Sequence, residues 1–549
     1  MLAFDDFDSE GFGPIGGPIR EGACGVQDRL FPESPLRRAW AGSNTPVRFS
    51  CAVLAVICAG STDAWSQGGP QERPLPPAPV PAENPITPEK AALGKILFWD
   101  EQLSADDSTA CGSCHLLAAG GSDPRATRPE SVHPGLDGLY DTPDDIRGSK
   151  GLVYLDLAGQ VIDDGVFYPE RQVTGRRSMP VINAAFSPEL FWDGRARGPF
   201  VDPETGEEVI AAGGALEIQA LGPILSSVEM SAAGRTWNDV TSKLAVAEPL
   251  AFARDLPEDV DAAIEAFPTY PELFEQAFGS PEITARRIAL AIATYERTLV
   301  ANQTPYDDFA RGDPNALTAD QTAGLAQIRQ VCGPCHNGPQ FTNHNFRNTG
   351  VRPIAEDVGR LAVTGNQPDR GRFKTPGLRN LAGRGPFFHN GGAETLAEVV
   401  DFYNRGGDFD QNVAPRIRPL GLTLNQRQQI EDFLTVGLTD PRADRGLPPF
   451  DHPTLRPHIR RGDSNHDGTV DLSDVLFLLG SVFFSEAELL CLDAADANDD
   501  GLVDVSDSVK ILTRLFLGDD PLPYPSDVST GPDLTEDALD CAGSPGLSG

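Results

Sequence analysis

The sequence predicts a mainly α-helical protein with several domains, and three observations support this fold class. Its 549 residues are enough for about three or four domains of roughly 150 residues each. Helices are indicated where Thr87 and Pro88 supply an N-cap and a first helical position, and where residues 283–299 align apolar side chains on one face. Two short motifs each occur twice, which indicates that parts of the chain are duplicated.

The composition is that of an acidic globular protein. Hydrophobic residues make up 40% of the chain and charged residues 23%. The net charge of -36 argues against nucleic acids and anionic membranes as partners, since both select basic patches. A field of this sign would steer a small basic electron carrier toward the protein, and simple solubility explains the charge equally well.

Residues 1–67 are expected to form a leader that holds a secretory signal. Basic residues at positions 37–48 precede the apolar run 49–60, which small and polar residues follow. This run is shorter than the roughly 20 residues that a transmembrane helix needs. A cleaved signal is the preferred interpretation, with a lipid anchor at Cys58 and an uncleaved anchor as alternatives. Residues 68–86 are rich in proline and are expected to form an extended linker.

The pattern C-x-x-C-H occurs at residues 111–115 and again at residues 332–336. It is the attachment signature of c-type haem, in which both thiols bond to the haem and the histidine becomes an axial iron ligand. Structural zinc is the alternative, but it needs four ligands per site, and neither copy has a second Cys/His pair nearby. Two covalent haems are therefore predicted, and their attachment also requires export. The expected haem-binding residues are Cys111, Cys114, His115, Cys332, Cys335 and His336.

Residues 87–445 resemble the bacterial di-haem cytochrome c peroxidase family. The resemblance rests on segments in the family's order, among them TGRRSMPVINAAF, FWDGR, SSVEM, FKTPGLRN and FFHNGG. It implies two cytochrome-c-like, mostly helical domains, at 87–312 and 313–445, with one haem each. It also implies that the N-terminal haem reduces hydrogen peroxide to water, while the C-terminal haem relays electrons from a donor such as a small cytochrome c. Members of this family are often homodimers.

The resemblance assigns roles to three side chains near the N-terminal haem. Glu229 matches the family's active-site glutamate and would be the acid/base group, while a solvated surface glutamate is the alternative. Burial beside haem would raise its pKa and suit proton transfer. Gln219 would be a second hydrogen-bonding group on the same side. Trp192 matches the tryptophan that lies between the haems and would relay electrons, with core packing as the alternative.

The sixth ligand of the C-terminal haem is expected to be unusual. Ordinary members use a methionine there, but Met1, Met179 and Met230 all lie outside the corresponding segment. Tyr403 stands in it, and a phenolate favours ferric iron. This resembles the di-haem enzyme that matures methylamine dehydrogenase, in which tyrosine ligates the second haem. Alternatively Tyr403 is a core aromatic, and His389 is the rival ligand.

The N-terminal haem is expected to be five-coordinate. Ordinary peroxidases carry a removable distal histidine in the segment that reads FYPERQVTG here, and this segment has none. The long loop between His115 and Gly175 contains only His133, which is either a surface histidine or a relocated distal ligand. An open iron position would let peroxide bind without reductive activation.

An Asp-rich loop occurs twice in the C-terminal region 462–549, which follows a Pro-containing linker at 446–461. Each copy places oxygen-bearing residues at the ligand positions of an EF-hand loop and glycine at position 6, a pattern that predicts calcium binding. Two acidic turns without calcium are the alternative. The expected ligands are Asp463, Asn465, Asp467, Thr469, Asp471 and Asp474 in the first loop, and Asp496, Asn498, Asp500, Leu502, Asp504 and Asp507 in the second.

This tail resembles a dockerin-type repeat pair, because no full helix precedes its first loop. The resemblance implies a small all-α calcium-binding module and a cohesin-like protein partner, although similar tails also occur as folded spacers. Cys491 and Cys541 could form a disulfide in an oxidising compartment.

These features together predict an exported, periplasmic oxidoreductase that carries two haems c and reduces hydrogen peroxide. One alternative is the oxidation of a protein or small-molecule substrate, as in the tyrosine-ligated enzyme. Another is a di-haem electron-transfer cytochrome that is docked through its calcium module.

Overall fold

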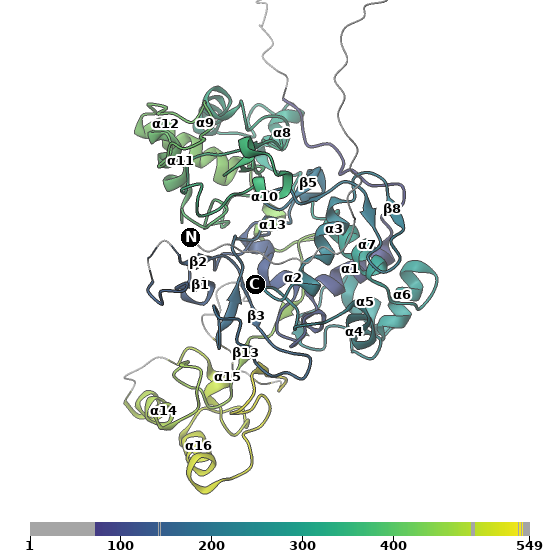
Figure 1. Ribbon diagram of the computed structural model, residues 1–549, viewed down its shortest axis with the longest axis vertical. Coiled ribbons are helices and arrows are strands. Elements are labelled where there is room, and N and C mark those ends of the chain that lie inside the picture. Colours follow the sequence, from purple (N-terminus) through teal and green to yellow (C-terminus); the bar gives the residue numbers. More distant parts are fainter. Residues whose placement is uncertain are drawn as a thin grey trace, which may run out of the picture. The chain divides into compact units, whose positions relative to one another are not determined.

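The computed structural model describes the chain from residue 72 onward, except for residues 141, 143, 485–488, 536, 538, 540 and 542–549. The expected signal at residues 49–60 therefore lies outside the described residues. No helix in the described part of the chain is long and apolar enough to cross a membrane. Helices and short two-stranded sheets form two haem domains and a C-terminal tail (Figure 1).

The first haem domain is built around the crossing of α1 (Pro88–Trp99) and α7 (Ala285–Glu296). α1 begins as predicted, because the Thr87 hydroxyl accepts a hydrogen bond from the Lys90 N–H at 3.3 Å. The helices touch at Gly94, where an added Cβ would lie 2.0 Å from the Ala291 carbonyl oxygen. The other helices here are η1 (Glu101–Leu103), α2 (Cys111–Cys114), η2 (Leu117–Ala119), η3 (Pro129–Ser131), η4 (Ala184–Phe186), α3 (Ala215–Leu221), η5 (Pro223–Leu225), α4 (Trp237–Leu244), α5 (Glu258–Ala266) and α6 (Tyr270–Phe278).

Four antiparallel strand pairs lie between α2 and α3, and the first two of them fall in the stretch between His115 and Gly175 that was predicted as a long loop. Their strands are only two to four residues long, so the fold remains mainly α. The pairs are β1 (Val132–His133) with β2 (Ile146–Arg147), β3 (Lys150–Val153) with β4 (Arg171–Val173), β5 (Glu189–Leu190) with β6 (Ala196–Arg197), and β7 (Phe200–Val201) with β8 (Glu208–Ile210).

The second haem domain repeats the helix crossing of the first. α9 (Ala319–Gln327) and α12 (Leu424–Asp432) meet at Gly324, where an added Cβ would lie 2.0 Å from the Gln429 carbonyl oxygen. Tyr306 packs into this second core, so α8 belongs here although it precedes the predicted boundary at 312. The other elements are α8 (Pro305–Arg311), η6 (Ile328–Cys332), α10 (Leu361–Thr364), η7 (Gln367–Asp369), α11 (Leu396–Arg405), η8 (Phe433–Gly437), α13 (Pro441–Asp444), and the pair β10 (Phe346–Arg347) and β11 (Phe373–Lys374).

Residues 446–461 connect the second haem domain to the tail, but they are not a free linker. Phe450 is fully buried and Leu455 is 2% exposed, and both belong to the core of the first haem domain. Their apolar contacts hold the proline-containing segment against that domain. β12 (Thr454–Leu455) pairs with β9 (Ala253–Arg254) of the same domain, and β13 (His458–Ile459) pairs with β14 (Gly531–Pro532) of the tail.

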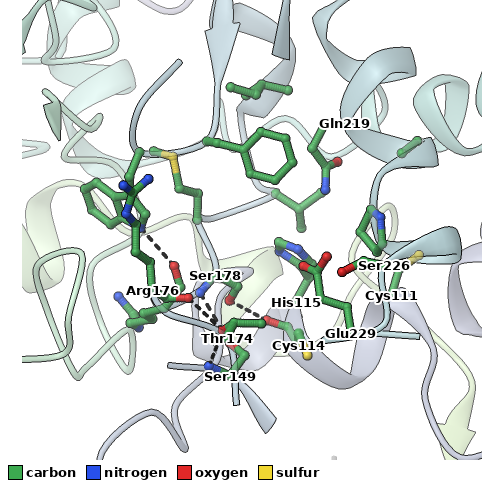
Figure 2. Close-up of a pocket in the computed structure, with 18 of the residues that line it drawn as sticks. Cys111, Cys114, His115, Ser149, Thr174, Arg176, Ser178, Gln219, Ser226 and Glu229 are labelled. Carbon is green, nitrogen blue, oxygen red and sulfur yellow. Dashed lines mark hydrogen bonds between the residues drawn. The ribbon is translucent and has the colours of Figure 1, made fainter. Parts of the chain in front are cut away.

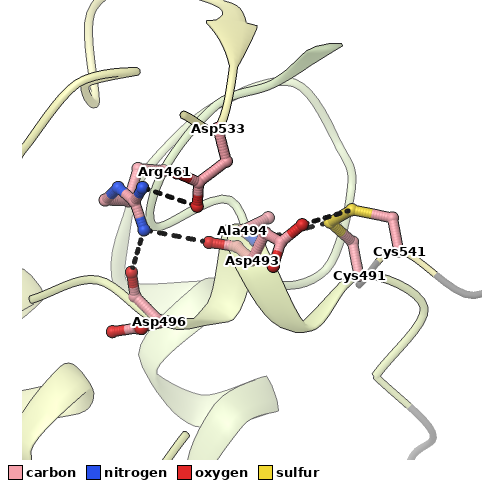
Figure 3. Close-up of a disulfide and its surroundings, with 7 residues drawn as sticks. All are labelled: Arg461, Cys491, Asp493, Ala494, Asp496, Asp533 and Cys541. Carbon is pink, nitrogen blue, oxygen red and sulfur yellow. Dashed lines mark hydrogen bonds and ion pairs between the residues drawn. A yellow bond between two sulfur atoms is a disulfide. The ribbon is translucent and has the colours of Figure 1, made fainter. Parts of the chain in front are cut away.

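The tail is a small module that contains two repeats of loop and helix. Its helices are α14 (Leu472–Phe484), α15 (Leu492–Ala495) and α16 (Val505–Leu517). Val475, Leu478 and Ile511 form the centre of its core. Cys491 and Cys541 form the disulfide that the sequence allowed, close to the buried Arg461 (Figure 3).

Candidate functional site

A cavity of about 660 Å³ in the first haem domain collects the residues that the sequence singled out around the N-terminal haem. Cys111, Cys114 and His115 lie on one side of it, and Gln219 and Glu229 reach it from other segments (Figure 2). Both cysteines are free thiols. A volume of this size is in the usual range for cofactor sites.

The C-x-x-C-H segment presents its side chains through the short helix α2. Cys111 and Cys114 are the first and last residues of this helix, and His115 caps its end. The His115 Nδ1 atom lies 3.3 Å from the Gly121 carbonyl oxygen, a contact that orients the ring and leaves Nε2 for a metal. Burial lowers the pKa of His115, which favours the neutral imidazole that binds iron.

Glu229 is held in a tight turn that follows η5. The Ser226 carbonyl oxygen accepts hydrogen bonds from the backbone N–H groups of Glu229, Met230 and Ser231, at 3.0, 2.9 and 2.9 Å. Burial raises the pKa of Glu229, while the Ser226 hydroxyl and the charge of Arg195 oppose the shift. A raised pKa makes a carboxyl group available as a proton donor and lets it be protonated and ionised in turn.

Two neighbouring segments fix the position of this turn. An added Cβ at Gly151, in β3, would lie 1.9 Å from the Val228 carbonyl oxygen, so β3 packs directly against the residue before Glu229. On the far side of the turn, the Ala233 N–H donates to the Leu155 carbonyl oxygen at 2.8 Å. The hairpin β3–β4 thus supports the turn that carries the candidate acid/base group.

Trp192 lies where the two haem domains meet. It is 7% exposed and lines both the first cavity and a second one in the other domain. Its indole N–H donates to the Arg177 carbonyl oxygen at 2.9 Å, and its ring is 6.3 Å from that of His389. The expected packing and relay roles are both compatible with this placement.

The second cavity, of about 690 Å³, contains the second C-x-x-C-H motif. Its lining includes Cys332, Cys335 and His336, and the His336 Nδ1 atom lies 2.9 Å from the Phe341 carbonyl oxygen. Tyr403, on α11, lines the same cavity, and burial raises the pKa of its hydroxyl. The rival ligand His389 also lines the cavity, but its ring stacks on Phe373 with the centroids 3.7 Å apart.

The residues of both cavities fit haem c. Each cavity offers two unpaired thiols for covalent attachment and one imidazole whose Nδ1 is already bound to a backbone carbonyl. When bound, the haem iron would supply the redox chemistry. His115 is the only histidine among the described residues that line the first cavity, so the protein offers no second imidazole there.

His133 is neither a surface residue nor a lining residue of the first cavity. It is 7% exposed, and its ring packs against that of Phe167 with the centroids 4.6 Å apart. Its Nδ1 atom accepts a hydrogen bond from the Gly135 N–H at 3.2 Å. His133 therefore serves the packing of the hairpin region, and the structure gives no support to a distal ligand role.

The two Asp-rich loops of the tail have the same internal hydrogen bonds. In the first, the Asp463 carboxylate accepts from the N–H of Gly468 at 3.0 Å, as the Asp496 carboxylate does from Gly501 at 2.8 Å in the second. The glycines have φ of 87° and 78°, which explains why glycine stands at position 6. The remaining expected ligands lie along the same loops, at Asn465, Asp467, Thr469, Asp471, Asp474, Asn498, Asp500, Leu502, Asp504 and Asp507.

The carboxylates of these loops are crowded. Burial raises the pKa of Asp463 and Asp474, and it raises that of Asp507 to about 6, with repulsion from Asp496 adding to the shift. Clustered carboxylates of this kind are stabilised by a hard divalent cation.

Sequence reasoning missed several residues of the site. Arg177 lines both cavities, Arg384 lines the second, and Ser149 and Lys150 of the hairpin region line the first. The only signal was the double arginine in GRRSMP, and nothing in that segment separates a cavity residue from a surface one.

Comparison with known proteins finds one family model and several similar chains. The family model described as di-haem cytochrome c peroxidase matches residues 88–315. The chain is 30% identical to the methylamine utilization protein MauG of Methylorubrum extorquens, over 74% of this chain and 96% of that protein. It is 29% identical to the cytochrome-c peroxidase IdrP1 of Denitromonas iodatirespirans, over 72% and 94% of the two chains. The diheme peroxidase BthA of Burkholderia thailandensis, a solved structure, aligns with 20% identity and a TM-score of 0.45 over 70% of this chain and 97% of that one.

Proposed function

We propose that this chain, which belongs to the di-haem cytochrome c peroxidase family and is a peroxidase-type oxidoreductase, reduces hydrogen peroxide to water at the haem of His115. The observation that carries the proposal is the common cavity of His115 and Glu229. Electrons would come from a donor protein such as a small cytochrome c and pass through the haem of His336.

Reduction of one peroxide molecule to two water molecules takes up two protons and two electrons. Glu229 would hold the proton that must move from one peroxide oxygen to the other, because its raised pKa lets it be protonated and ionised in turn. Gln219 lines the same cavity and would donate or accept a hydrogen bond to the bound peroxide. The support that Gly151 gives to the turn would keep Glu229 in place during turnover.

Electron delivery would use Trp192 and Tyr403. Trp192 lines both cavities, and its indole would connect the two haems. Tyr403 shares a cavity with His336 and would be the second axial ligand of that haem. A phenolate ligand stabilises ferric iron and would suit a relay that holds an oxidising equivalent.

The decisive experiment mixes the haem-loaded enzyme with hydrogen peroxide and follows the haem spectrum. We expect Glu229→Gln to slow the reaction roughly 10²- to 10⁴-fold, whereas Glu248→Gln, at an exposed position of the same domain, leaves it unchanged. A Glu229→Gln enzyme that reacts at the native rate would contradict the acid/base role. A native enzyme whose spectrum does not respond to peroxide would instead favour a di-haem electron-transfer cytochrome.

Oxidation of a protein or small-molecule substrate is the second candidate function. The position of Tyr403 in the second cavity favours it, because the tyrosine-ligated relatives that the sequence resembles carry out this kind of reaction. The peroxidase and the substrate-oxidising enzyme differ in the second compound that each needs in order to consume peroxide. A peroxidase consumes peroxide in proportion to a reduced donor, whereas the second activity consumes it only when the oxidised substrate is present.

The tail would bind two calcium ions and dock a partner of the cohesin type. Its helices α14 and α16 expose apolar side chains at matching repeat positions, Leu476 and Val509 at 63% and 52%, and Phe483 and Phe516 at 60% and 67%. Exposed apolar side chains of this size often mark a protein-binding surface. Binding of a purified cohesin domain with and without chelator tests this role, and the pair Leu476→Asp and Val509→Asp should abolish calcium-dependent binding.

The protein would be exported to the periplasm. Covalent attachment of haem c requires export, and the Cys491–Cys541 disulfide favours an oxidising compartment outside the cytoplasm. Fractionation of cells that produce the full chain tests this directly, with haem-loaded protein expected only in the exported fraction.

A further inference from the structure

Two buried arginines occupy the junction between the haem cavities. Arg177 follows β4 in the first domain and is 2% exposed, and Arg384 belongs to the second domain and is 4% exposed. Arg177 lines both cavities and Arg384 lines the second. The two residues are in contact, since the Arg177 guanidinium donates a short hydrogen bond to the backbone carbonyl oxygen of Arg384.

Neither arginine forms an ion pair with a carboxylate of the described residues. The Arg177 Nε–H donates to the Asp123 carbonyl oxygen at 3.1 Å, but the Asp123 carboxylate is bound by Arg125 at 2.9 Å. Arg384 makes one long contact, from Nη1 to the Gly377 carbonyl oxygen at 3.4 Å, and its buried Nε–H has no partner.

Other buried arginines of this chain are paired with carboxylates. Arg297 binds Glu217 at 2.7 Å, Arg379 binds Asp307 at 2.8 Å, and Arg461 binds Asp533 at 2.8 Å. A buried charge without a counter-ion is strongly unfavourable. Arg177 and Arg384 are therefore the exceptions, and their position on the cavity walls indicates that the counter-ion is an anion bound in the cavities.

Burial affects both groups in the same direction. It lowers the pKa of Arg177 to about 9, with repulsion from Arg384 adding to the shift, and it lowers the pKa of Arg384 to about 10. An anion between the two guanidinium groups would reverse this effect. Each guanidinium presents a planar pair of N–H donors, which matches the two oxygens of a carboxylate.

We propose that Arg177 and Arg384 form a clamp that binds haem propionate carboxylates at the junction of the two cavities. Every haem c carries two propionates, and Arg384 reaches only the cavity of His336, so that haem contributes at least one of them. Arg177 lines both cavities and can also contact a propionate of the haem of His115. The clamp is independent of the peroxide chemistry, because it requires only that both haems are attached.

The clamp also holds the relay residue in place. The Arg177 carbonyl oxygen accepts the indole N–H of Trp192, and the Arg177 N–H donates to the His389 carbonyl oxygen at 2.9 Å. A propionate bound to the Arg177 side chain would therefore fix the haem edge relative to Trp192. Arg177 and Arg384 act here as positioning residues, since they do not touch the iron.

The test is the reduction potential of the haem of His336, measured by spectroelectrochemistry on the full haem-loaded protein. A cation near the haem stabilises the reduced iron, so Arg384→Leu should lower this potential. We expect the equilibrium constant for reduction to fall at least tenfold, which is about 59 mV for one electron. The potential should also become more dependent on pH, because a buried propionate that has lost its counter-cation has a raised pKa. Arg311→Leu removes an exposed, paired arginine from the same domain and should change neither property.

A second variant keeps the test valid if Arg384→Leu does not accumulate in folded form. Arg384→Lys keeps the charge but loses the two parallel N–H donors, so the propionate bending band in the resonance Raman spectrum should shift. The proposal is overturned if Arg384→Leu retains both haems with an unchanged potential. It is equally overturned if the bending band of Arg384→Lys is that of the native protein.

Discussion

Gly151→Ala should disable the enzyme although residue 151 carries no chemistry. The added Cβ would lie 1.9 Å from the Val228 carbonyl oxygen, and the closest contact that real Cβ atoms tolerate is 3.0 Å. Val228 or β3 must therefore move by at least 1.1 Å. Val228 immediately precedes Glu229. The Ser226 carbonyl oxygen accepts hydrogen bonds from Glu229 and the two residues after it, so a shift of Val228 would move the whole turn.

The size of the effect follows from this displacement. A shift of about 1 Å in a catalytic group costs roughly 10²-fold in rate, or about 2.7 kcal/mol of transition-state stabilisation. We expect kcat for peroxide reduction to fall by about that factor, while the haem content and the spectrum of the haem of His336 stay native. Gly480→Ala is the matched control, because its Cβ would meet nothing within 4 Å. Native turnover by a haem-loaded Gly151→Ala enzyme would refute the idea that β3 positions Glu229.

Three further outcomes are expected. Tyr403→Phe should change the ferric spectrum of the haem of His336 and raise its reduction potential, because a phenolate donor is lost; an unchanged ferric spectrum would exclude tyrosine ligation. Burial raises the pKa of Glu296 from 4.5 to about 8, so the folded chain keeps a proton that the unfolded chain releases. The free energy of unfolding should therefore fall as the pH rises from 4.5 to about 8. Glu296→Gln should remove this contribution to the pH dependence. The same pH dependence of the free energy of unfolding in both proteins would count against it. Calcium at about 100 times its Kd should stabilise the tail by about 2.7 kcal/mol for each bound ion, measured as a higher melting temperature that chelator reverses. Asp474→Ala and Asp507→Ala should each remove one bound ion, and native calcium content in both would contradict the ligand assignment.

The sequence predicted those parts of the site that lie in contiguous motifs. Cys111, Cys114 and His115 form one unbroken pattern, and Glu229 and Trp192 stand in short segments whose order resembles a known family. The structure brings all of them to one cavity or to the junction beside it. Local patterns carry this information because each motif is positioned by its own short element.

Contacts between distant segments could not be predicted in the same way. The hydrogen bond between Arg177 and Arg384 joins residues 207 positions apart, and no local pattern encodes it. The contact of Gly151 with Val228 depends on how a hairpin folds back over a turn. Composition was also misleading for His133, because a loop rich in glycine and aspartate suggested exposure while Phe167 buries the ring.

The connector at 446–461 shows the same limit. Its prolines indicated a spacer, because proline disfavours regular structure. Proline does not prevent burial, however, and Phe450 and Leu455 pack into the first haem core. A connector without helices can thus be fixed against a domain by two buried apolar side chains and a two-residue strand pair.

The most direct test is a low-temperature EPR spectrum of the resting, fully oxidised enzyme with both haems attached. We expect one high-spin ferric signal, from a haem that has His115 and an open sixth position, because no second imidazole among the described residues lines that cavity. We expect one low-spin signal from a haem ligated by His336 and Tyr403. Two low-spin signals would contradict this division of roles, since neither haem would then be open to peroxide.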